Sequence, residues 1–119
     1  MQLFMILRRD GWNWPYDLEA SVAHSRKVAE EEMAGEVRWI RSYVLDEGGR
    51  GIGTVCLFEA TDPEAIRRHG ALTDMPVDEI VAINDTLVMR PDPHPADLTA
   101  LPRGRAVPAA VARLPLRAA

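Results

Sequence analysis

Several features that would point to particular classes of protein are scarce or missing in this sequence. Among its 119 residues there is one cysteine, Cys56, so no disulfide can form within the chain. A lack of disulfides is typical of proteins kept in a reducing compartment, and we expect the protein in the cytoplasm. No apolar run approaches the roughly 18 residues that a membrane-spanning helix needs. We therefore expect no association with a membrane.

An excess of basic residues is also missing. The formal net charge is −4, and residues 1–89 hold 16 of the 18 acidic side chains but only 9 of the 14 basic ones. Nucleic-acid binding requires clustered lysine and arginine to contact phosphates, so we expect no nucleic-acid partner. The chain also contains no glycine-rich phosphate loop, nucleophile elbow or paired-cysteine zinc motif.

The distribution of proline divides the chain. Residues 90–119 hold six of the nine prolines, whose rings interrupt helices and central strands. We predict one domain over residues 1–89, the size of a single modest core, and a proline- and arginine-rich tail over residues 90–119. Within the tail, residues 109–113 suit a short helix, and an extended arm around a neighbouring subunit is the alternative.

Apolar periodicity and helix-capping residues predict four strands and two helices in residues 1–89. Strands are expected over Leu3–Arg8, Glu36–Asp46, Ile52–Ala60 and Ile80–Met89. The first helix is expected from Leu18 to Ala34 after an Asp17 cap, and the second from Pro63 after an Asp62 cap. Glycines in "EGGRG" predict a hairpin turn between the middle strands. The order β-α-β-β-α-β is that of the α+β ferredoxin-like sandwich.

Several strands are apolar on both faces, which predicts a second cover for the sheet. In the second strand, strict alternation places Val37, Trp39, Tyr43 and Leu45 on one face, with Arg41 interrupting them. Two helices cover only one face of a four-stranded sheet, and a bare apolar face is a large exposed patch. We therefore expect a homodimer whose sheets pack face to face into a dimeric α+β barrel, with a cavity between the sheet and the helices in each subunit.

Three segments of the sequence resemble a known family. These are "VRWIRSYV", "VCLFEATDPEAIRRHG" and "MPVDEIVAI". They are similar to a widespread bacterial family of small proteins of unknown function that includes a nickel-binding ferredoxin-like protein. The resemblance spans about residues 2–89 and implies a dimeric α+β barrel and binding of a transition metal. The matching positions are Trp39, Ser42, Tyr43, Cys56, Glu59, Asp62, Pro63, Glu64 and His69.

With a metal implied by the resemblance, Cys56 and His69 are the candidate ligands for nickel or a similar divalent ion. A thiolate and a neutral imidazole both suit such ions. The plainer alternatives are a buried cysteine acting as a small hydrophobe and a structural histidine on the second helix. No two of the three histidines have the i, i+4 spacing of a metal motif. Arg41 stands where many relatives have histidine, and a permanent cation cannot bind a metal.

Two other functions are compatible with the pattern. Dimeric α+β barrels include cofactor-free monooxygenases, cyclases and isomerases, and by that analogy the cavity would hold a small organic ligand. In such an enzyme His69 and Tyr43 would act as acid or base, and Arg41 would bind an anionic group. The other alternative is an interaction module whose cavity is filled by its own side chains.

Overall fold

The computed structural model describes residues 1–49 and 51–93. It contains strand β1 (Gln2–Trp12), helix α1 (Pro15–Lys27), the π-helical turn η1 (Val28–Glu32), β2 (Val37–Asp46), β3 (Ile52–Ala60), α2 (Pro63–Thr73) and β4 (Glu79–Ile83). The strands form one four-stranded sheet in the order β2-β3-β1-β4, and each neighbouring pair is antiparallel. The predicted ferredoxin-like α+β order is confirmed.

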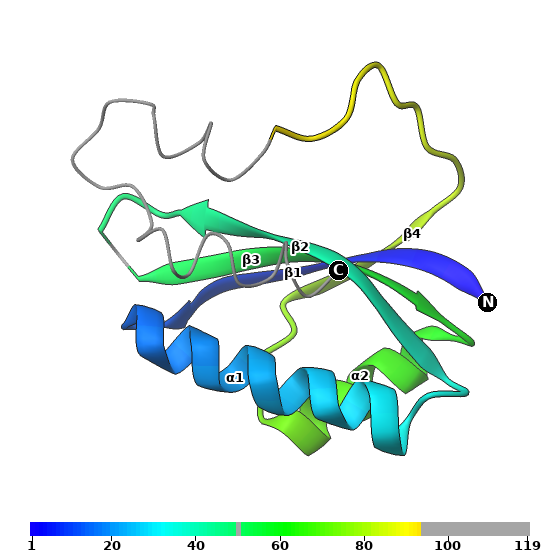
Figure 1. The fold of residues 1–119 in the computed structure, drawn as a ribbon, viewed down its shortest axis with the longest axis horizontal. Coiled ribbons are helices and arrows are strands. Elements are labelled where there is room, and N and C mark those ends of the chain that lie inside the picture. Colours follow the sequence, from blue (N-terminus) through cyan, green and yellow to red (C-terminus); the bar gives the residue numbers. More distant parts are fainter. Residues whose placement is uncertain (50, 94–119) are drawn as a thin grey trace.

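Both helices lie against the same face of the sheet, and the segment that follows β4 lies on the opposite side (Figure 1). The core fills the space between sheet and helices. Its centre is formed by Phe4 and Ile6 of β1, Cys56 and Phe58 of β3, and Ile66 of α2. A smaller cluster around Trp12, Leu18, Val22 and Met75 extends this core toward the start of α1.

The second helix begins as the sequence predicts. The Asp62 carboxylate accepts a hydrogen bond of 2.8 Å from the Ala65 backbone N–H, and Pro63 occupies the first helical turn. Proline is favoured there because its missing N–H would have no partner within the helix. The predicted turn "EGGRG" is also confirmed, since Gly48, Gly49 and Gly51 all have positive φ angles.

The predicted start of the first helix was wrong by one turn. Helix α1 starts at Pro15, with Trp14 rather than Asp17 at the N-cap position. Asp17 lies in the first turn, where its charge still favours the helix N-terminus. The helix then passes into η1, and the wider π-helical turn brings both Val28 and Ala29 into the core.

Two predicted strands have different ends. Strand β1 continues past Arg8 to Trp12 through an irregularity in its pairing with β3, where Asp10 has a positive φ of 51°. Strand β4 ends at Ile83 rather than Met89, because Ile83 pairs with Leu3 at the beginning of β1. Because β1 begins at Gln2, residues after Ile83 have almost no β1 residue left to pair with.

A β-bulge in β2 changes the faces predicted for its side chains. Trp39 pairs with Phe58, but Arg41 pairs with Leu57, so Ile40 is the extra residue. One inserted residue moves every later side chain to the other face. Ser42 therefore joins Trp39 on the helix-facing side, whereas Tyr43 points to the side away from the helices. The prediction that Trp39 and Tyr43 share a face was wrong.

We call the side of the sheet that faces away from the helices the open face. Its residues on the paired strands are Leu3, Met5, Leu7, Arg41, Tyr43, Val55 and Leu57. Among the residues that the structure describes, no helix is long and apolar enough to cross a membrane. The tail predicted for residues 90–119, including the short helix at 109–113, lies mostly outside the described residues.

Candidate functional site

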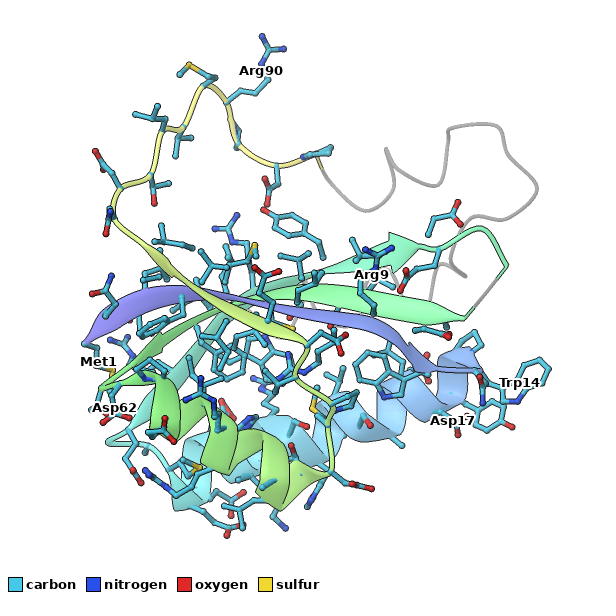
Figure 2. All side chains as sticks on the ribbon, turned by 180° about the vertical axis from the view of Figure 1, so that it is seen from behind. Met1, Arg9, Trp14, Asp17, Asp62 and Arg90 are labelled. Carbon is cyan, nitrogen blue, oxygen red and sulfur yellow. The ribbon has the colours of Figure 1, made fainter. Side chains whose placement is uncertain are left out.

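Side chains from the sheet and from both helices point into the layer between them, whereas Arg90 lies on the opposite side of the sheet (Figure 2). Cys56 is in this layer, at the middle of β3, and only 1% of it is exposed. Its neighbours across the sheet are Ile6 of β1 and Ser42 of β2. The Ser42 hydroxyl donates to the Cys56 sulfur over 3.0 Å, and the Trp39 indole N–H donates to the Ser42 oxygen over 2.7 Å.

His69 reaches the same layer from α2 and is 0% exposed. Its ring packs on Phe58, with 5.3 Å between the ring centroids. Nε2 lies 2.9 Å from the Ser25 carbonyl oxygen. Because a carbonyl only accepts, Nε2 must carry the hydrogen and Nδ1 must hold a lone pair. Within residues 1–49 and 51–93, that buried Nδ1 has no hydrogen-bond partner.

The protonation of His69 follows from its surroundings. Burial lowers the pKa of the imidazole, the bond to Ser25 opposes this, and the nearby charges of Arg8 and His24 lower the pKa further. The ring is therefore neutral near pH 7. Histidines that bind metals commonly hold one ring N–H on a backbone carbonyl and present the other nitrogen to the ion. His69 has this arrangement.

The sequence reasoning missed Arg8, a buried cation in this layer. Arg8 follows Phe4 and Ile6 at two-residue spacing, so it lies on the helix-facing side of β1, and it is 0% exposed. None of its guanidinium nitrogens has a hydrogen-bond partner in the part of the chain that the structure describes. Burial lowers the pKa of Arg8, and the attraction of Cys56 and Asp78 opposes this. The alternation Phe4, Ile6, Arg8 was the signal that would have identified it.

Arg41 and Tyr43 meet on the open face, together with Asp92. The Asp92 carboxylate lies 2.7 Å from Arg41 Nη1 and accepts a hydrogen bond of 2.7 Å from the Tyr43 hydroxyl. The Tyr43 hydroxyl and then the Arg41 charge lower the pKa of Asp92. These side chains line a groove of about 690 Å³ between the open face and residues 86–92, whose walls are mainly apolar.

The candidate residues are thus divided between two faces of the sheet. Cys56 and His69 lie on the helix-facing side, whereas Arg41 and Tyr43 lie on the open face. The sheet separates His69 from the other two residues predicted for an enzyme. Within the described ranges, no group of three or more His, Cys, Asp or Glu side chains is placed to hold a metal ion. His24 is exposed on α1, and His94 lies outside the described residues.

Comparison with known proteins identifies relatives. The sequence profile of a family described as "Nickel responsive protein SCO4226-like" matches residues 4–83. The crystal structure of SCO4226 from Streptomyces coelicolor A3(2) is similar in fold, with a TM-score of 0.56 and 19% sequence identity. That similarity covers 71% of this chain and 99% of SCO4226. No curated protein sequence matches.

Proposed function

Because this chain belongs to the SCO4226-like family of nickel responsive proteins, we propose that it is a small homodimeric protein that binds nickel or a similar divalent ion. His69 is the proposed ligand, with Cys56 as the second donor. The observation that carries the proposal is the His69 ring, whose Nε2 is held on the Ser25 carbonyl while its buried Nδ1 has no partner in the described chain.

The chemistry of these two donors suits nickel. A neutral imidazole and a thiolate bind borderline divalent metals, whereas oxygen-only sites favour magnesium and calcium. Among the described residues no three or more His, Cys, Asp or Glu side chains are grouped to hold an ion, so water or a small anion would complete the shell. The nearby Arg8 charge repels a bare dication, which favours an anionic ligand on the metal.

Metal uptake by the full-length protein tests this proposal. Purified protein freed of metal is dialysed against nickel, and the bound nickel is measured by elemental mass spectrometry. We expect wild-type protein and the exposed-histidine control His24→Ala to retain nickel, and His69→Ala to lose most of it. Cys56→Ser would remove any sulfur-to-nickel charge-transfer absorption. No uptake by wild-type protein, or uptake unchanged by His69→Ala, contradicts the proposal.

The open face supports the homodimer. Leu3, Met5, Leu7, Val55 and Leu57 of the central strands are only half-buried in the single chain. Covering such an apolar sheet face with a second sheet removes it from water. Sedimentation of wild-type protein should give a dimer at micromolar concentration. Met5→Glu should shift it toward monomer, whereas Ala23→Glu on the exposed side of α1 should not. A wild-type monomer at all concentrations contradicts this assignment.

A second candidate function is supported by the groove on the open face. Arg41 and Tyr43 hold a carboxylate there, and the adjoining walls are apolar. This combination suits a small organic acid as the substrate of an enzyme, although the groove lies on the other side of the sheet from the cavity predicted for the dimeric α+β barrel type. Native mass spectrometry of freshly purified protein would detect such a ligand. If this second function is correct, the bound ligand should disappear from the mass spectrum of Arg41→Gln and remain in that of Arg38→Gln.

A further inference from the structure

The Arg8 side chain carries a buried positive charge that no described group fully compensates. Its guanidinium group is always protonated in proteins and offers five N–H donors. An arginine that is 0% exposed and lacks hydrogen-bond partners is costly unless a compensating anion is present. The protein must therefore supply or recruit a group that accepts these hydrogen bonds.

The neighbouring protein groups do not fill this role. The Cys56 sulfur attracts the guanidinium and favours its charge through a weak hydrogen-bond interaction, but it leaves the guanidinium nitrogens without a hydrogen bond of full geometry in the described chain. Asp78 also attracts it, but its carboxylate is exposed and accepts a hydrogen bond from the Arg9 backbone N–H. Two buried hydroxyl groups belong to Thr54, which pairs with Arg8 across the sheet, and to Ser42. Both hydroxyls are neutral, so neither compensates the charge of Arg8.

We propose that Arg8 binds a small oxyanion, a carboxylate or hydrogencarbonate, in the layer between the sheet and the helices. Two oxygens of one anion match the paired N–H groups of a guanidinium. An anion with its own hydroxyl, such as hydrogencarbonate, also has a donor for the unpartnered Nδ1 of His69. The neighbouring hydroxyls and thiol form a polar surround. The anion is expected to be small because Arg8 is 0% exposed.

This inference goes beyond the proposed metal binding and does not depend on it. If nickel binds His69, the same anion would reduce the repulsion between the Arg8 charge and the nickel ion. The experiment therefore uses full-length protein freed of metal with an uncharged chelator such as 1,10-phenanthroline, so that a failure of nickel binding leaves the result unaffected. The buffer contains only a bulky sulfonate as its anion.

Thermal unfolding measures the binding. Formate, acetate, hydrogencarbonate and phosphate are titrated separately, with chloride at equal ionic strength. At tenfold the dissociation constant, a bound oxyanion raises the Tm of a domain of this size by roughly 5–10 °C. We expect a saturable rise for wild type and for Arg9→Met, a matched control in which the exposed neighbouring arginine is replaced. Arg8→Met should show no rise. The oxyanion that saturates at the lowest concentration identifies the ligand.

A measurement on the wild-type protein covers the case in which Arg8→Met does not fold. The Nε–H signal of a buried arginine exchanges slowly and can be followed by nitrogen-edited NMR. The Arg8 signal should shift with the same saturation as the Tm, while the Arg9 signal should not. An equal Tm rise with chloride, no saturable rise, or an unchanged Arg8 signal would overturn the inference.

Discussion

The buried, neutral state of His69 makes the stability of this protein depend on pH. In the folded protein, burial above all lowers the pKa of the ring below its ordinary 6.5. In the unfolded chain the ring titrates near its ordinary value. Between these two pKa values the unfolded chain binds a proton that the folded protein does not. The free energy of unfolding therefore rises with pH through this window and falls as the solution is acidified.

The size of the effect has a clear upper limit. If the folded ring stays neutral at pH 5.5, one unit below the unfolded pKa, protonation of the unfolded chain lowers the free energy of unfolding by RT ln 11, about 1.4 kcal/mol, relative to high pH. A folded pKa closer to 6.5 gives a smaller loss. The hydrogen bond to Ser25 opposes the effect of burial, so we expect a loss smaller than this limit.

Urea unfolding followed by tryptophan fluorescence at pH 7.5, 6.5 and 5.5 measures this loss. Protein concentration is held constant because the stability of a dimer depends on it. His69→Gln removes the titrating group, and the loss attributable to it should vanish even though the variant is less stable at every pH. The control His24→Gln replaces an exposed histidine of α1 and should keep most of the wild-type dependence, because burial is the main cause of the lowered pKa of His69. A wild-type dependence retained in His69→Gln would refute the reasoning.

Two further predictions concern the local structure. At Gly53 a β-carbon would lie 2.6 Å from the Arg8 carbonyl oxygen and would also meet the Glu47 carboxylate, so Gly53→Ala should lower the free energy of unfolding by about 1–3 kcal/mol. Gly35→Ala is the control, because nothing lies within 4 Å of its β-carbon, and an equal loss there would contradict the steric argument. Asp62→Ala removes the cap of α2 and should cost about 1 kcal/mol in the same urea assay. Retention of wild-type stability would mean that the cap contributes nothing.

The sequence was sufficient for features that depend on neighbouring residues. The cap at Asp62, the proline after it and the glycine-rich turn are short-range signals, and each is present in the structure. The apolar run of residues 52–60 predicted β3 for the same reason. The order of elements and the fold class followed from these local features.

Features that depend on pairing between distant segments were not predicted. The bulge at Ile40 moved Tyr43 and Arg41 to the open face, because the register with β3 decides which residue is extra. Strand β4 stopped at Ile83 because β1 begins near Leu3. The meeting of Asp92 with Arg41 and Tyr43 joins residues 49 or more positions apart, and no local pattern signals it.

The candidate site shows the same division. The sequence identified Cys56 and His69 as candidate metal donors and placed both in the ferredoxin-like domain. Only the tertiary structure decided that His69 Nε2 is held by the Ser25 carbonyl, 44 positions away, and that the charge of Arg8 lies buried beside them. Periodicity reports which face a side chain occupies, whereas its hydrogen-bond partners depend on which distant elements pack against that face.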